Sequence, residues 1–175
     1  MRRFGLLTVL ACMAASTHAL ELHSDDMQEG HMLNKAQEFN GFGCSGDNIS
    51  PHLKWTNLPE GTKSVAVTAY DPDAPTGSGW WHWLVVNLPV DTASLPAGIS
   101  GKLKKGLEVE TDYGTPGFGG ACPPVDHGMH RYQFTVWALN TSALDVSAET
   151  PAAVVGYKLN SAVIAKDTLT ATYAR

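Results

Sequence analysis

The segment from residue 65 to residue 88 dictates the local fold of this chain more strongly than any other. Both of its ends, residues 65–70 and 83–86, are rich in β-branched and aromatic residues, which favours two half-buried strands. The loop between them begins with prolines, which restrict the backbone, and continues with glycines, which allow the chain to reverse direction. The segment therefore predicts two strands joined by a loop that is rigid where it begins and flexible where it ends.

The same segment concentrates unusual side chains, with Asp71 at the end of the first strand and His82 among tryptophans at the start of the second. An acidic turn and core tryptophans would account for these residues equally well if they stood alone. However, residues 128–139 again place polar side chains, His130 and Tyr132, at the beginning of a strong strand. Two such placements favour a lined pocket at the strand ends.

Together with two further motifs, these segments resemble the phosphatidylethanolamine-binding protein family. The motifs, in the family's order, are NISP at 48–51 with LKW at 53–55, DPDAP at 71–75, WHWLVVN at 81–87 and GMHRY at 128–132. The secreted bacterial, Raf-kinase-inhibitor-like branch of the YbhB/YbcL type is the most similar. Its members are similar in carrying a Gly-x-Gly-Cys segment, here residues 41–44, and a Cys-Pro-Pro segment, here residues 122–124.

The resemblance implies a pocket for a small anion such as phosphate or a phospholipid headgroup. The residues that it assigns to this pocket are Asp71, Trp80, His82, Cys122, Pro123, His130 and Tyr132. Imidazole N–H groups and a phenol can donate hydrogen bonds to anion oxygens, and a carboxylate can orient a histidine and favour its charged form. We expect the glycine-rich loop to add backbone N–H donors and the tryptophans to exclude water.

Two histidines and an aspartate also occur together as a metal site, and spacing alone does not separate the two chemistries. His127 lies close to His130 in the sequence, and we interpret it as an exposed loop residue. No Gly-x-Ser-x-Gly motif is present and no serine is linked by its spacing to either pocket histidine, so we expect neither catalysis nor a cofactor. The expected function is binding. The alternative is an interaction protein that inhibits an enzyme or modulates a host or envelope partner through its surface.

Many short strands, long loops and one late helix predict a mainly β protein, and the resemblance implies an antiparallel Greek-key sandwich. The elements expected outside the central segment are two short strands within residues 20–40, a strand at 131–139, a helix at 151–166 capped by Thr150, and a closing strand at 168–173. The glycine-rich residues 40–48 and residues 112–124 are expected to form loops, and the second loop to form a pocket wall.

The first 19 residues have the three regions of a secretory signal peptide, which leaves residues 20–175 as one domain. Cys12 permits a lipoprotein attachment site as a less favoured alternative, because Leu10 fits such a site poorly. No later apolar run approaches the length of a membrane span, so we expect a periplasmic or secreted protein without stable membrane insertion.

Removal of the signal leaves two cysteines, Cys44 and Cys122, in an oxidising compartment, which favours a disulfide over two buried free thiols. The whole chain has a net charge of −5 at pH 7, and loss of Arg2 and Arg3 makes it two charges more negative. The largest basic cluster, residues 102–105, is typical of a solvated loop. The charge therefore argues against a nucleic-acid partner.

We also predict that the protein forms a homodimer, because bacterial relatives are similar in sometimes pairing and because exposed sheet edges favour association. Size-exclusion chromatography with light scattering at several concentrations measures the mass. A mass near that of the monomer at every concentration would exclude the dimer.

Overall fold

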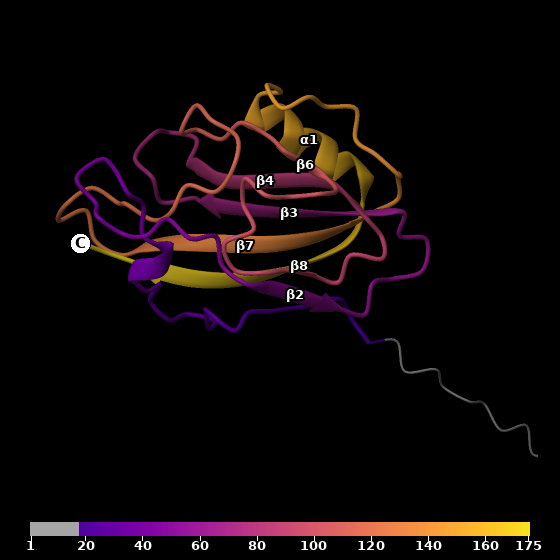
Figure 1. Cartoon of the computed structure of the whole chain (residues 1–175), viewed down its shortest axis with the longest axis horizontal. Helices are drawn as coiled ribbons and strands as arrows, with labels where there is room; N and C mark the ends of the chain where they lie inside the picture. The colour runs from indigo at the N-terminus through magenta and orange to yellow at the C-terminus, as the bar shows by residue number, and fades with distance from the viewer. Residues whose placement is uncertain (1–17) are drawn as a thin grey trace, which may run out of the picture.

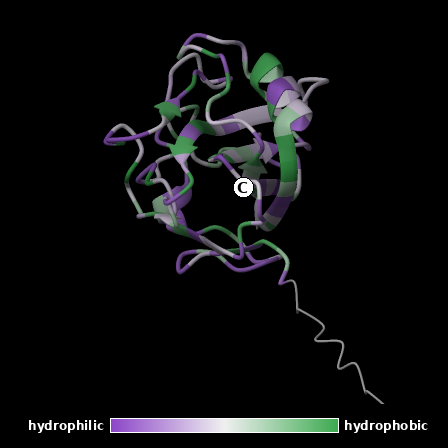
Figure 2. Cartoon of the chain, turned by 90° about the vertical axis from the view of Figure 1, so that its right-hand side faces the viewer, coloured by the Kyte–Doolittle hydropathy of each residue, from purple (hydrophilic) through white to green (hydrophobic). Residues whose placement is uncertain are grey.

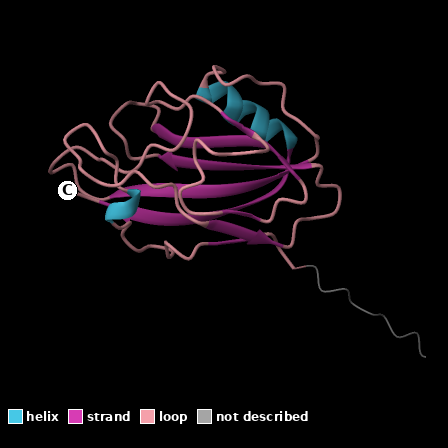
Figure 3. Ribbon diagram, viewed as in Figure 1, coloured by secondary structure: helices cyan, strands magenta, loops and turns pink. Residues whose placement is uncertain are grey.

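Two antiparallel sheets packed face to face form the body of the protein (Figures 1 and 3). The structure is a computed structural model and describes residues 18–175. The smaller sheet has the order β1 (Glu21–His23), β2 (Leu53–Thr56) and β5 (Ser94–Leu95). The larger sheet has the order β6 (Leu107–Glu108), β4 (Trp80–Pro89), β3 (Ser64–Asp71), β7 (His130–Leu139) and β8 (Val163–Tyr173). A short 3₁₀ helix, η1 (Lys35–Gln37), and one α-helix, α1 (Ala152–Ala162), complete the described elements.

The larger sheet follows a Greek-key order. β3, β4 and β6 are neighbours in sequence order within this sheet, and the chain then returns so that β7 pairs with β3. The predicted antiparallel Greek-key sandwich is therefore confirmed.

The two faces of β7 belong to two different cores. Tyr132, Phe134 and Val136 are buried between the sheets, whereas Trp137 and Leu139 are buried on the opposite face, which α1 covers. The side chains of the strand predicted at 131–139 therefore alternate between two cores. Burial of each large apolar side chain contributes about 1.5–3 kcal/mol, so both faces hold the sheet in place. Figure 2 shows hydrophobic and hydrophilic turns along α1, as expected for a helix with one buried face.

Two expected elements differ in the structure. Residues 20–40 hold one strand, not two, because Asn34 accepts a hydrogen bond from the backbone N–H of Ala36 and starts the 3₁₀ turn. The helix ends at Ala162, four residues before the expected Lys166. From Val163 onward the backbone pairs with β7. The hydrogen bonds of this strand pair replace those that a longer helix would make.

The expected N-cap was also wrong. Pro151 occupies the N-cap position and makes no side-chain capping bond. The Thr150 hydroxyl instead accepts a hydrogen bond from the backbone N–H of Ser147 at 2.9 Å, which closes the preceding turn.

Two loops that are far apart in sequence are fastened together near the end of the sheet where β3 ends and β7 begins. The disulfide Cys44–Cys122 joins them, as predicted. Asn48 also bridges them, because its side chain accepts from the backbone N–H of Gly120 at 2.7 Å and donates to the carbonyl of Phe118 at 3.2 Å. The disulfide and these two hydrogen bonds thus fasten the wall of residues 118–122 to the first loop.

Buried Glu38 anchors the same region. Burial alone would raise the pKa of its carboxyl, but hydrogen bonds from Lys35, Tyr173 and the backbone of Ser45 outweigh burial and lower the pKa to about 2. The carboxylate therefore stays charged at physiological pH and ties the first loop to β8.

Between residues 18 and 175, no helix is long and apolar enough to cross a membrane. Residues 1–17 of the expected signal segment, which include Cys12, lie outside the described residues.

We predict that the chain from residue 20 onward contains no free thiol in its unreduced, denatured state. Because the bond closes a separation of 78 residues, the Cys44→Ala/Cys122→Ala variant should lose up to about 4 kcal/mol of unfolding free energy. Thiol titration and urea unfolding measure the two quantities. Two reactive thiols in the unreduced protein would contradict the pairing.

Candidate functional site

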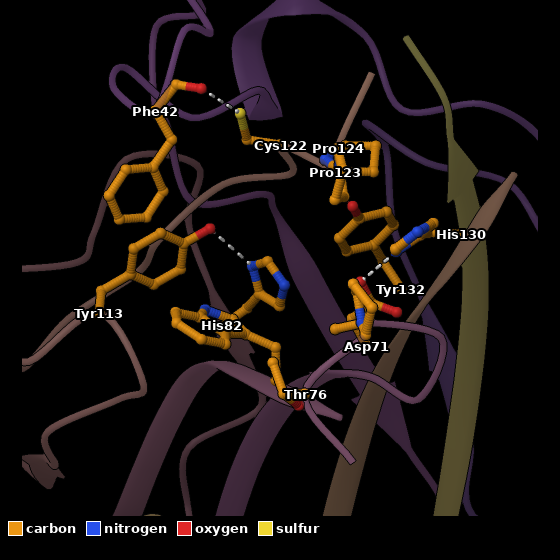
Figure 4. A pocket seen from close by; sticks show the side chains of 13 residues that line it. Phe42, Asp71, Thr76, His82, Tyr113, Cys122, Pro123, Pro124, His130 and Tyr132 are labelled. Carbon is orange, nitrogen blue, oxygen red and sulfur yellow. Dashed lines mark hydrogen bonds and ion pairs between the residues drawn. The ribbon is translucent and has the colours of Figure 1, made fainter. Parts of the chain in front are cut away.

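A cavity of about 200 Å³ opens where β3 ends and β7 begins, at the left end of the molecule in Figure 1. The seven residues predicted for the pocket all line it: Asp71, Trp80, His82, Cys122, Pro123, His130 and Tyr132. The structure thus brings together every side chain that the resemblance assigned to the site, from three strands and one loop (Figure 4).

A buried hydrogen bond between a histidine and a carboxylate lies at the side of the cavity. His130 Nδ1–H donates to Asp71 Oδ2 across 2.6 Å, and the two side chains are only 1% and 4% exposed. The other carboxylate oxygen, Asp71 Oδ1, accepts the backbone N–H of Asp73 at 2.8 Å. Both oxygens are therefore satisfied, and Asp71 holds His130 in one orientation, as the sequence predicted.

The DPDAP loop is clamped to β7 by a second acidic residue. Asp73 accepts hydrogen bonds from the guanidinium of Arg131 at 2.7 and 2.8 Å and from its backbone N–H at 2.9 Å. The hydrogen bond from Arg131 is the main cause that lowers the pKa of Asp73 to about 2. Because Arg131 is exposed, water screens this pair and it adds little to stability, but its forked geometry fixes the loop beside His130.

His82 is held by the opposite wall of the pocket. Its Nδ1–H donates to the carbonyl of Gly119 at 2.7 Å, and the backbone N–H of Gly119 donates back to the His82 carbonyl at 2.8 Å. Burial lowers the pKa of His82, so its ring is neutral at pH 7 and its Nε2 carries a lone pair. Within the described chain, Nε2 makes no hydrogen bond to protein.

Two tyrosines stand on either side of His82. The Tyr113 hydroxyl donates to the carbonyl of Gly120 at 2.7 Å, whereas the Tyr132 hydroxyl makes no hydrogen bond to any residue that the structure describes. Burial raises the pKa of both phenols, so each remains a protonated donor. The rings of His82 and Tyr132 meet edge to face, with centroids 5.0 Å apart.

The glycine-rich wall has a role other than the expected one. The backbone N–H groups of Gly119, Gly120 and Ala121 donate to His82, Asn48 and Gln37 inside the protein. These three N–H groups are therefore not available to an anion, and the expectation of backbone donors stays a prediction for the rest of the loop. The glycines allow close approach, because a Cβ on Gly119 would lie 2.3 Å from the Tyr113 ring.

Sequence reasoning did not identify Tyr113 or Phe42 as individual pocket residues, although it placed both in loops. Their rings stack with centroids 5.8 Å apart and form the outer wall of the cavity. The only available signal was aromatic residues inside otherwise glycine-rich loops.

His127 is exposed, as predicted, but it is not isolated. Its Nδ1 lies 2.7 Å from Nε2 of His130. Both nitrogens of His130 are thus engaged by protein groups, and no pattern in the sequence predicts the contact with His127.

Charge around the cavity is sparse. Of the residues that line it, Asp71 is the one carboxylate, and none is a lysine or an arginine. Outside the lining, the guanidinium of Arg175 donates to the carbonyls of Phe42 and Pro123 and places a positive charge beside the rim. Across residues 18–175, no group of three histidine, cysteine, aspartate or glutamate side chains is arranged to hold a metal ion.

The chain is similar in sequence to known proteins. A family model described as phosphatidylethanolamine-binding protein matches residues 23–174. YbcL of Escherichia coli strain K12 is 46% identical over an alignment that covers 99% of this chain and 98% of YbcL. YbhB of the same strain is 47% identical, with 89% of this chain and 100% of YbhB covered.

Solved structures agree as well. The crystal structure of E. coli YbcL, described as a new member of the mammalian PEBP family, matches with a TM-score of 0.88 at 45% identity. It covers 90% of this chain and 99% of the YbcL chain. A putative phosphatidylethanolamine-binding protein homolog from Chlamydia trachomatis matches with a TM-score of 0.75 at 27% identity, covering 90% and 98% of the two chains.

We predict that His82 makes folding stability depend on pH. Because the pKa of His82 is lower in the folded protein than its ordinary value of about 6.5, the unfolded chain binds more protons between these two values. Stability should therefore fall as the pH drops from about 7 through this range, by about 1.4 kcal/mol for each unit of pKa lowering.

The variant His82→Asn retains a donor for the Gly119 carbonyl but does not titrate, so its unfolding free energy should vary less between pH 7 and pH 5. Urea unfolding across this range measures the slope. The exposed His31→Asn variant is the matched control, and equal slopes for His82→Asn and wild type would refute the assignment.

Proposed function

Since this chain belongs to the phosphatidylethanolamine-binding protein family, we propose that it is a non-catalytic binding protein for a small anion of the phosphate or phospholipid-headgroup type. The proposal rests on two polar atoms, Tyr132 Oη and His82 Nε2, which make no hydrogen bond within the described chain. Their residues lie side by side in the lining of a cavity with apolar walls. Buried polar groups without protein partners favour a ligand that satisfies them.

These two atoms can bind a phosphate that shares one proton with His82 Nε2. The Tyr132 hydroxyl donates to an anion oxygen, and burial keeps it protonated. Neutral His82 Nε2 either accepts the P–OH proton of a phosphate monoanion or takes up a proton as the anion binds. In both cases one proton lies between Nε2 and a phosphate oxygen, so binding is favoured at lower pH.

The size of the cavity favours a headgroup over a larger ligand. Its volume of about 200 Å³ lies below the range of about 300–1,000 Å³ of drug-sized ligand sites. A phosphate with a short substituent fills such a space, and the rest of a larger molecule would extend past Phe42, which is 69% exposed at the rim.

The apolar walls strengthen these few polar contacts. Trp80, Pro123 and the stacked rings of Phe42 and Tyr113 limit the access of water to the polar atoms. Electrostatic interactions gain strength when water is excluded, so a neutral donor can bind an anion here without a lysine or arginine in the lining.

We place this activity outside the cytoplasm, in the periplasm or in the secreted fraction. The proposal rests on the signal-like first 19 residues and on the Cys44–Cys122 disulfide, which forms in oxidising compartments.

A second candidate function is an interaction protein that acts through the surface around the pocket. It is favoured by three large apolar side chains exposed there or in the adjoining loop, Phe42, Val125 and Met129, with exposures of 69%, 62% and 55%. The Tyr132→Phe variant separates the two, because it removes only a pocket hydroxyl, which a surface-only inhibitor tolerates losing and an anion-dependent protein does not.

We predict that Tyr132→Phe weakens the binding of inorganic phosphate or O-phosphoethanolamine about 10-fold to 100-fold. The reason is that a hydrogen bond to a charged group contributes about 1.5–3 kcal/mol, and this change removes only the hydroxyl. Titration calorimetry between pH 5 and pH 8 should also show affinity that falls as the pH rises.

Tyr157→Phe is the matched control, since Tyr157 is 74% exposed on α1, away from the cavity. Wild-type affinity in the control together with a loss in Tyr132→Phe supports the site. An affinity that does not change with pH or with Tyr132→Phe would mean that the anion binds elsewhere.

A further inference from the structure

Three side chains form a hydrogen-bonded chain from solvent to the buried carboxylate beside the pocket. His127 Nδ1 lies 2.7 Å from His130 Nε2, and His130 Nδ1 lies 2.6 Å from Asp71 Oδ2. His127 is exposed, whereas His130 and Asp71 are buried. The chain therefore has one end in water and the other end beside the anion cavity.

The loop before β7 is shaped so that it turns His127 inward. Asp126 has φ +60° and Gly128 has φ +93°, so the residues on both sides of His127 occupy the left-handed region. The two imidazole rings consequently meet with centroids 5.0 Å apart and an interplanar angle of 62°. This pairing depends on a tight turn and not on strand register.

The hydrogen count in this chain allows two charge states without movement of heavy atoms. One hydrogen lies between His130 and Asp71, and one lies between the two imidazoles. If His127 Nε2 carries no hydrogen, the three groups together have a charge of −1. If His127 Nε2 gains a hydrogen from solvent, the three groups together are neutral.

The charge state of these three groups affects an anion in the neighbouring cavity. Asp71 lines the cavity with a negative charge, and no lysine or arginine in the lining offsets it. An anion is repelled by the unprotonated chain and much less by the protonated chain, because the field of a buried charge is weakly screened. Binding of the anion must therefore favour uptake of the proton.

We propose that His127 is the solvent-side proton carrier of an Asp71–His130–His127 relay that takes up one proton when an anion enters the pocket. The inference rests on the proposed anion-binding function. It states that a loop residue, His127, sets the pH range over which the anion binds. His127 acts through His130 and is a positioning residue; it does not itself line the cavity.

Other charged groups near the relay do not account for a proton taken up between pH 5 and pH 8. Asp73, from the loop after β3, is paired with Arg131 of β7, and its pKa is lowered to about 2. Burial raises the pKa of Tyr132 on β7, and burial together with Glu38 raises the pKa of Tyr173 on the adjacent β8 to about 12.

Three further groups complete the surroundings of the relay. Asp126 and Arg175, in contact through the Asp126 N–H and the Arg175 carbonyl, lie on the solvent side. His82 is across the cavity, so it is the one competing proton acceptor that a test must separate.

The test is calorimetric titration with sulfate, an anion that does not itself titrate in this range, between pH 5.5 and pH 8 in buffers of different ionisation enthalpy. Near neutral pH, wild type should take up as many as two protons per bound sulfate, one through the relay and one at His82 Nε2, and its affinity should fall up to tenfold per pH unit for each of these protons that is lost. His127→Asn keeps a hydrogen-bonding group beside His130 Nε2 but cannot take up a proton. This variant should take up about one proton fewer per bound sulfate than wild type and show a flatter affinity profile.

Two control variants make the outcome specific. His82→Asn removes the competing acceptor, so it should bind sulfate more weakly but still take up, for each sulfate bound, the proton that depends on His127, and the exposed His31→Asn should match wild type. A His127→Asn profile that is lower by the same factor at every pH, with proton uptake unchanged, overturns the relay and shows a purely structural role. In that case wild-type binding still supports the proposed function. Failure of wild type to bind either phosphate or sulfate would remove the proposed function and the relay together.

Discussion

The buried hydrogen bond between Asp71 and His130 is the interaction on which the site depends. It links the last residue of β3 to the first residue of β7, so it joins the two central strands where the cavity opens. A buried carboxylate is costly unless its oxygens are satisfied, and here His130 and the Asp73 backbone satisfy both. The DPDAP and GMHRY motifs therefore act as one unit, and the Asp73–Arg131 pair holds that unit closed.

The opposite wall depends on packing between loops. Gly119 has no side chain where it packs against the Tyr113 ring, and Gly120 has none where it packs against the backbone of residues 37–39. In this position their carbonyls accept hydrogen bonds from His82 and Tyr113. Asn48 and the Cys44–Cys122 disulfide then fasten this backbone to the first glycine-rich loop. The result is a small apolar cavity in which most polar groups are already paired, so that the few unpaired ones select the ligand.

Much of the fold and of the pocket could be predicted from the sequence, and the failures have physical causes. The strand at 131–139 could be predicted because its side chains follow the period of two that a strand imposes. The end of α1 was missed because Val163 can continue a helix or begin a strand, and pairing with β7 decides between them. The role of the 119–121 backbone and the contact between His127 and His130 depend on tertiary hydrogen bonds and on one turn, which no local pattern encodes.

The central claim is that an anion binds between Tyr132 and His82, beside the Asp71–His130 pair. A crystal structure of the protein soaked with tungstate, a phosphate-like anion with strong anomalous scattering, would test this most directly. The account predicts one dominant anomalous peak in the cavity, with oxygens within hydrogen-bond distance, about 2.7–3.2 Å, of Tyr132 Oη and His82 Nε2. A pocket without an anomalous peak, in crystals that bind tungstate only at surface lysines, would contradict it.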